Sequence, residues 1–148
     1  MGKGLTQFPA ELYHFSALQR LGLEESQLSS VPPQVGQLTN LESLHVDDNH
    51  LSSLPAELGQ LPKLELLSLN NNQFSSFPVQ AGQFAHLHTL YLNGNQFSSL
   101  PLELGQLPRL HVLYLENNPV MDQLPLEVRK HDSSLLSVVI QEYIRRLR

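Results

Sequence analysis

The side chains of this chain that are best suited to chemistry are its seven histidines, its tyrosines and its paired serines, and the chain has no cysteine. His88 and His111 are 23 residues apart, as are Tyr91 and Tyr114. Two imidazoles fall short of a zinc site, and the third ligand would have to be Tyr91, Glu65 or Glu116. We therefore expect no metal site and no cofactor.

The acidic and hydroxyl side chains also lack the patterns of a calcium site or a nucleophile. Calcium needs six or more oxygen ligands around it, which the acidic residues would have to supply from an open surface: Glu24, Glu25, Asp47 and Asp48. The serine pairs recur without a paired base, at Ser52/Ser53, Ser75/Ser76 and Ser98/Ser99. The phosphate-binding, dinucleotide-binding, zinc-protease and hydrolase motifs are all missing from the sequence. These observations predict that the chain is not an enzyme.

Composition and charge exclude further classes of function. The chain has 148 residues, 41% of them hydrophobic, which suits one folded domain. Its formal net charge of −5 has the wrong sign for a nucleic-acid surface. No apolar run approaches the ~20 residues that cross a bilayer, and MGKGLTQ lacks the apolar centre of a signal peptide. We expect a cytoplasmic protein with no nucleic-acid or membrane partner, although Gly2 and Thr6 loosely match an N-myristoylation pattern.

A repeated unit dominates the chain, which contains 32 leucines. Four contiguous segments start at Leu18, Leu41, Leu64 and Leu87 with a constant period of 23 residues, and a fifth starts at Leu110 with LHVLYLENNPV. Residues 4–17 match the second half of the same unit. We predict a single domain over 1–148, with a partial repeat at 4–17, the five repeats, and a capping helix at about 132–147.

Each column of the repeat has a physical interpretation. The L-x-L pairs alternate with period two, which predicts short strands that stack into a parallel sheet with one buried face. Asparagines recur where the chain leaves each strand, and their amides can pair turn backbone groups: Asn49, Asn72, Asn95 and Asn118. Prolines 9, 32, 55, 78 and 101 precede a segment whose apolar spacing fits a 3₁₀ turn. Gly36, Gly59, Gly82 and Gly105 are expected to let the chain turn back.

The pattern L-x-x-L-x-L-x-x-N-x-L resembles the leucine-rich repeat family, over about 125 of the 148 residues. This resemblance implies an α/β solenoid: a curved horseshoe arc with its parallel sheet on the concave face and short 3₁₀ or helical turns on the convex face. The 23-residue form with N-x-L-S-S-L-P and E-L-G-Q-L-P is similar to intracellular Ras-group, scribble-like and Roco-type arrays and to bacterial effector arrays. Members of these groups generally act as scaffolds.

The two ends of the array differ. At the C-terminus Asp132 can cap a helix that runs to about Leu147, with an apolar stripe formed by Leu135, Leu136, Val139, Ile140, Tyr143, Ile144 and Leu147. We interpret this helix as a cap, and the alternative is a protruding helix that binds a partner. At the N-terminus no cap is visible. Three explanations are open: the half unit protects the core by itself, the chain is part of a longer array, or the open end pairs with another molecule.

The residues between the strand leucines are expected to point out of the concave face and carry any specificity. The candidate partner-binding residues are Tyr91, Tyr114, His45, Leu66, Val112, His88, His111, Glu24, Asp47, Asp48, Asn70, Asn93 and Glu116. Residues 1–74 carry eight acids and three bases, whereas residues 75–148 carry six of each. The surface therefore has an acidic end, formed by Glu24, Glu25, Glu42, Asp47 and Asp48, and an end with two adjacent tyrosines.

These observations predict a non-catalytic protein–protein interaction module, a scaffold or a bacterial effector acting in the host cytosol, whose partner is a protein. One alternative is the recognition arm of a larger enzyme, such as a Roco-type GTPase or a ubiquitin-ligase effector. The ending P-L-E-V…I-Q-E-Y-I-R-R-L resembles the junction of Roco-type proteins. We expect a monomer, and a dimer joined through the N-terminal edge is the other possibility.

Overall fold

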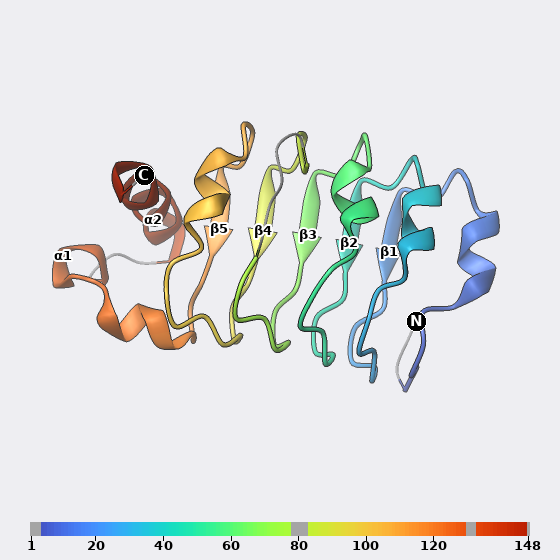
Figure 1. Cartoon of the computed structure of the whole chain (residues 1–148), viewed down its shortest axis with the longest axis horizontal. Coiled ribbons are helices and arrows are strands. Elements are labelled where there is room, and N and C mark those ends of the chain that lie inside the picture. The colour runs from blue at the N-terminus through green and yellow to red at the C-terminus, as the bar shows by residue number, and fades with distance from the viewer. Residues whose placement is uncertain (1–3, 78–82, 130–132, 148) are drawn as a thin grey trace.

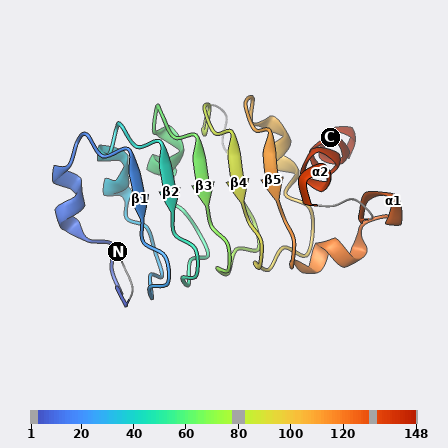
Figure 2. The same ribbon diagram turned by 180° about the vertical axis from the view of Figure 1, so that it is seen from behind.

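The structure is a computed structural model that describes residues 4–77, 83–129 and 133–147. Its centre is one parallel sheet of five strands in chain order. Neighbouring strands pair in register at an offset of one repeat, so that Leu44 lies beside Leu21 and Leu67 beside Leu44. The strands are β1 (Arg20–Gly22), β2 (Ser43–His45), β3 (Leu66–Ser68), β4 (Thr89–Tyr91) and β5 (Val112–Tyr114). Figures 1 and 2 show them side by side, with the chain termini at opposite ends.

Five short 3₁₀ turns are described, and three of them return the chain from one strand to the next on the side opposite the strands (Figure 1). The five turns are η1 (Ala10–His14), η2 (Pro33–Gln37), η3 (Ala56–Gln60), η4 (Leu102–Gln106) and η5 (Pro119–Gln123). A proline precedes each of the first four turns as expected, because its fixed φ suits the entry to a turn and it needs no donor there. Pro78 and Gly82 lie outside the described residues.

Two of the recurring glycines, Gly36 and Gly59, serve close packing, and the expectation that they supply turn conformations is wrong. Gly36 and Gly59 lie inside η2 and η3, and positive φ among the described glycines occurs only at Gly4 and Gly94. A Cβ on Gly36 would lie 3.1 Å from Cβ of Glu57, and one on Gly59 would lie 2.9 Å from Cβ of Gln83. Each glycine therefore makes room for the next repeat.

The asparagine ladder is buried between the repeats. In Asn72, Oδ1 accepts a hydrogen bond from the backbone N–H of Leu51 at 2.9 Å. Its Nδ2 donates to the carbonyls of Val46 at 3.0 Å and Leu69 at 3.2 Å. The same bonds recur one repeat apart, at Asn49, Asn72, Asn95 and Asn118. Ser26 occupies this position in the first full repeat, and its Oγ donates only a long bond of 3.4 Å to Glu24 O.

Two helices follow the last repeat, α1 (Leu126–Arg129) and α2 (Ser133–Leu147). Helix α2 packs against β5 and η4, with Ile140 and Ile144 each only 1% exposed. Nε2 of the buried Gln141 donates to His111 O at 2.6 Å, which ties the helix to the last strand. The helix therefore covers this end of the array, as the sequence predicts. Asp132 lies outside the described residues, as do the side chains of Leu135, Leu136 and Val139.

Candidate functional site

Figure 2 shows the strands on the side nearest the viewer, and the surface on this side of the sheet is here called the concave face. The central leucine of each strand is buried, with at most 2% of its surface exposed. Because side chains alternate along a strand, the residues before and after this central leucine point outward. They form two columns that cross the sheet: Arg20, Ser43, Leu66, Thr89 and Val112, and Gly22, His45, Ser68, Tyr91 and Tyr114. Most are half-buried, whereas Arg20 is exposed and Ser68 is buried.

Tyr91 and Tyr114 lie face to face on β4 and β5. Their ring centroids are 5.1 Å apart and their planes differ by 2°. Strand register places the two residues directly beside each other, which brings the rings to the distance of a stacked aromatic pair. Both side chains are half-buried, so the pair presents a flat apolar surface with hydroxyl groups that can donate or accept.

The two histidines of the same repeats also stack. The ring centroids of His88 and His111 are 5.0 Å apart with an interplanar angle of 16°. Nδ1 of His88 lies 3.0 Å from Thr89 Oγ1, and Nδ1 of His111 lies 2.6 Å from Arg109 O. Across the described part of the chain, no three histidine, aspartate or glutamate residues are grouped to hold a metal ion. The third predicted histidine, His45, lies on β2 with Nε2 2.9 Å from Ser43 Oγ.

A second hydrogen-bond ladder runs along the C-terminal ends of the strands, and the sequence reasoning missed it. Oδ1 of Asp47 accepts bonds from the backbone N–H of Asn70 at 2.7 Å and from Ser68 Oγ at 2.6 Å. Oδ1 of Asn70 accepts from Asn93 N at 2.9 Å, and Oδ1 of Asn93 accepts from Glu116 N at 2.8 Å. These three predicted binding residues therefore also hold neighbouring repeats together. The sequence carried one signal for this ladder, which is that Asp or Asn recurs at the same position of successive repeats.

The acidic end of the concave face lies at β1 and β2, away from the tyrosines on β4 and β5. Two of its carboxylates are already hydrogen-bonded, since Asp48 Oδ1 accepts from Asn71 Nδ2 at 2.9 Å in addition to the bonds of Asp47. The β3 repeat separates the two ends and contributes the half-buried Leu66. The acidic end and the tyrosine end are thus separate surfaces of the same face.

Comparison with known families agrees with this architecture. A family model described as "Leucine rich repeat" matches residues 16–74. A second, described as "Leucine Rich repeats (2 copies)", matches residues 85–127. The chain belongs to the leucine-rich repeat family. Domains of this family are in general non-catalytic modules for protein interaction.

Solved leucine-rich repeat structures resemble the chain closely. A Leptospira interrogans leucine-rich repeat protein is 38% identical with a TM-score of 0.73, over 86% of this chain and 32% of that one. The ectodomain of the Arabidopsis thaliana receptor kinase GASSHO1/SCHENGEN3, in complex with CASPARIAN STRIP INTEGRITY FACTOR 2, is 34% identical with a TM-score of 0.65, over 78% and 14%. The leucine-rich repeat domain of the type III effector XopL is 26% identical with a TM-score of 0.65, over 80% and 43%.

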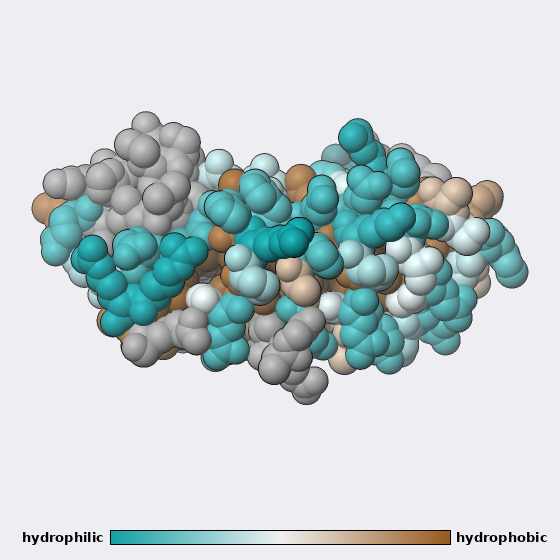
Figure 3. All heavy atoms as spheres, turned by 90° about the horizontal axis from the view of Figure 1, so that it is seen from above, coloured by the Kyte–Doolittle hydropathy of each residue, from teal (hydrophilic) through white to brown (hydrophobic). Residues whose placement is uncertain are grey.

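This chain therefore spans less than half the length of each of these structures. No curated protein matches it in sequence. Among the described residues, no helix has the length and apolar character to cross a membrane. Figure 3 views the leucine-rich repeat array along its strands, and hydrophilic residues dominate that side, with hydrophobic residues visible between them.

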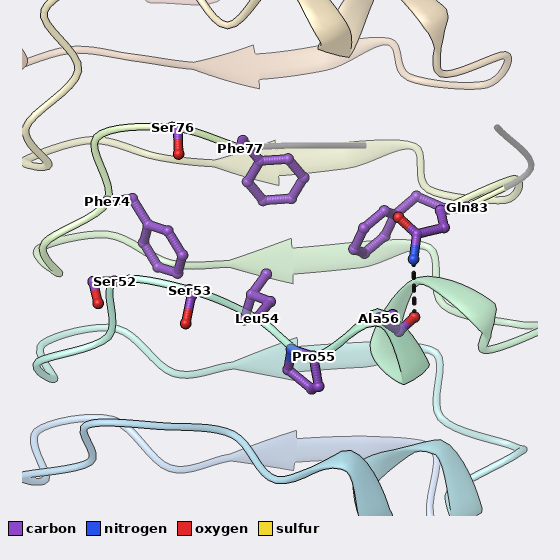
Figure 4. A pocket seen from close by; sticks show the side chains of 10 residues that line it. Ser52, Ser53, Leu54, Pro55, Ala56, Phe74, Ser76, Phe77 and Gln83 are labelled. Carbon is purple, nitrogen blue, oxygen red and sulfur yellow. Dashed lines mark hydrogen bonds between the residues drawn. The ribbon is translucent and has the colours of Figure 1, made fainter. Parts of the chain in front are cut away.

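A pocket of about 220 Å³ lies away from the concave face, between the repeats that start at Leu41 and Leu64 (Figure 4). Phe74, Phe77 and Phe84 line one side of it, and Leu54 lies opposite. The preceding repeat has leucine at all three equivalent positions. The pocket therefore lies at a point where the repeat starting at Leu64 carries larger side chains than the repeat before it.

Proposed function

We propose that this leucine-rich repeat array is a non-catalytic module that binds a protein partner through its concave face, with Tyr91 and Tyr114 as the anchor. The stacked tyrosine pair is the observation that carries the proposal. Tyrosine is among the residue types that contribute most at protein interfaces, because it offers a large contact area and has few rotatable bonds. Stacking restricts the two rings further, so less side-chain entropy is lost on binding.

The acidic end has a different role in this proposal. Residues 1–74 carry the whole net charge of −5, so their field attracts a partner with a basic surface. Exposed charges increase the association rate more than they increase the affinity. The partner therefore combines an apolar or aromatic segment for the tyrosines with basic residues for the acidic end. A scaffold or effector role draws support from the Leptospira protein and the type III effector among the structural neighbours.

The test is affinity capture with mass spectrometry, comparing the wild-type chain with Tyr91→Ala/Tyr114→Ala from the same lysate. The expected result is a partner that the wild type retains and the double variant loses. When the purified partner is titrated against each protein, the double variant should bind it at least about tenfold more weakly. The matched control is Gln60→Ala/Gln106→Ala, which removes two exposed side chains of η3 and η4 on the opposite side. It should retain the same partner.

Circular dichroism verifies that both double variants fold. Tyr91→Phe/Tyr114→Phe keeps the stacked rings and removes only the hydroxyl groups, so it separates apolar anchoring from hydrogen bonding. A partner retained equally by the wild type and by the folded alanine variant would exclude the tyrosines as the anchor. The acidic end and α2 would then be the next surfaces to test.

A second candidate, the recognition arm of a larger protein, rests on chain length. The array covers 32% of the Leptospira protein and 43% of the XopL repeat domain that it resembles. The reading frame around the coding region tests this proposal: an adjoining catalytic domain in the same frame supports it, and stop codons on both sides exclude it.

A further inference from the structure

Two rows of side chains run across the repeats where the chain enters the strands, at the end opposite the arrowheads in Figure 2. Backbone hydrogen bonds of 2.8 or 2.9 Å join neighbouring repeats one residue before the strands and align the first row: Gln19, Glu42, Glu65, His88 and His111. The second row lies two residues earlier along the chain: Asn40, Lys63, His86 and Arg109. Both rows end in imidazole or guanidinium groups at the repeats of β4 and β5.

The last two members of each row form one cluster, here called the basic ridge: His86, His88, Arg109 and His111. The rings of His88 and His111 stack with their centroids 5.0 Å apart. Nη1 of Arg109 lies 3.3 Å from Nδ1 of His86, and the carbonyl of Arg109 accepts from Nδ1 of His111 at 2.6 Å. His86 is half-buried and the other three are exposed, so the ridge is accessible to a partner.

No acidic side chain among the described residues balances the basic ridge. The charged residues of the elements around it are Lys63 and Glu65 beside β3, Glu103 on η4, and Glu142, Arg145 and Arg146 on α2. The carboxylate of Glu142 already pairs with both arginines of α2, at 3.6 and 3.9 Å. Within the described part of the chain, no member of the ridge forms an ion pair with a carboxylate.

The charge of the basic ridge depends on pH. Imidazole gains its proton between about pH 8 and pH 5, whereas guanidinium is charged throughout. When His111 is neutral, its Nδ1–H donates to a carbonyl and its Nε2 can only accept, so it cannot bind an anion. Two protonated imidazoles stacked at this distance repel each other, and an anion between them offsets the repulsion. Binding of an anion and uptake of protons therefore favour each other.

We propose that the basic ridge binds an acidic segment of the protein partner through its carboxylates, and that this binding tightens as the pH falls from about 7.5 to about 5.5. His88 precedes Tyr91 by three residues, which is about 10 Å along a strand, so one extended partner can reach both the ridge and the tyrosine pair. That the ligand belongs to a protein rests on the proposed function. An acidic segment here and a basic one at the acidic end would orient the partner across the sheet.

The test is an NMR titration of the isotope-labelled chain with N-acetylated hexaglutamate. At about pH 5.5 the peptide should shift the backbone amide signals of His88, Arg109 and His111. Its dissociation constant should be at least about tenfold lower than at about pH 7.5. In His88→Gln/His111→Gln this pH dependence should fall below about threefold, because the remaining ridge residues hold fewer protons.

His14→Gln/His50→Gln is the matched control, because it removes two exposed histidines outside the ridge. It should bind hexaglutamate like the wild type. Tyr91→Ala/Tyr114→Ala should also bind it normally, which keeps this test separate from that of the tyrosine anchor. Circular dichroism verifies that each variant folds.

Two results would overturn the proposed ridge site: no binding of hexaglutamate at about pH 5.5, or a ridge variant with the same pH dependence as the control. A wild type that binds short single-stranded DNA in preference to hexaglutamate would refute the assignment of carboxylates as the ligand.

Discussion

The substitution Asn72→Ala tests the physical role assigned to the buried asparagine ladder. It removes the acceptor of the Leu51 N–H, and both residues are buried, at 0% exposure for Leu51 and 6% for Asn72. It also removes the donor to the carbonyls of Val46, Leu69 and Asn70. An unpaired buried donor costs about 1–3 kcal/mol, and the unmatched carbonyls add to it, so we expect a loss of about 3 kcal/mol in the free energy of unfolding.

Urea denaturation followed by circular dichroism measures this loss. With a slope of about 2 kcal/mol per M, the midpoint should fall by about 1.5 M at an unchanged slope. Gln73→Ala is the matched control, since it truncates the adjacent exposed side chain, and it should change stability by less than about 0.5 kcal/mol. A loss for Asn72→Ala no larger than that of the control would refute the argument that the amide pairs otherwise unsatisfied backbone groups.

Three further substitutions test the turns and the N-terminal end. Gly94 has φ +69° and a Cβ there would lie against Asn71 Oδ1, so Gly94→Ala should destabilise by about 2 kcal/mol in urea denaturation. Glu25 occupies the equivalent left-handed position with φ 53°, and Glu25→Asn should raise the thermal midpoint through a gain of about 1 kcal/mol. The buried hydroxyl of Tyr13 has no hydrogen-bond partner among the described residues, and burial raises the pKa of Tyr13. The folded state therefore holds the phenol proton more tightly, and this contribution to stability is complete below about pH 10 and is lost as pH rises through the raised pKa. Melting curves at neutral and alkaline pH should show Tyr13→Phe at least as stable as the wild type near pH 7 and less sensitive to alkali; a less stable variant with an unchanged alkaline decline would contradict this reasoning.

The sequence predicts the fold well because the period of 23 residues carries most of the information. One buried leucine per strand, one asparagine per turn and one proline per return segment define the repeat, and stacking identical units leaves a single register. Helix α2 could be predicted because its sequence departs from the 23-residue period. The subdivision into one partial and five full repeats stays a prediction, as does the complete list of binding residues.

What the sequence could not supply was the reason for individual residues within a column. In a sequence, a recurring glycine indicates either an unusual φ or a close neighbour. At positions 36 and 59 the distances to Glu57 and Gln83 show that the reason is the close neighbour. Asp47 and Asn70 point outward, which suggested recognition, yet their oxygens bond the backbone of the next repeat. The period of the sequence shows which residues occupy equivalent positions in the repeats. The atoms that each residue contacts depend on the exact course of the backbone, which the period does not give.

The two ladders point in opposite directions along the array. Each buried asparagine accepts from the repeat before it, as Asn95 does from Phe74 N at 3.0 Å. Each outer side chain accepts from the repeat after it, as Asn70 does from Asn93 N. Shortening the chain from its C-terminal end therefore removes the acceptors of buried N–H groups such as that of Phe74, while shortening it from the N-terminal end removes the N–H donors that pair with the buried asparagine oxygens. The kind of buried group that the loss of a repeat leaves unpaired thus depends on the end from which the repeat is removed: N–H donors at the C-terminal end and amide oxygens at the N-terminal end.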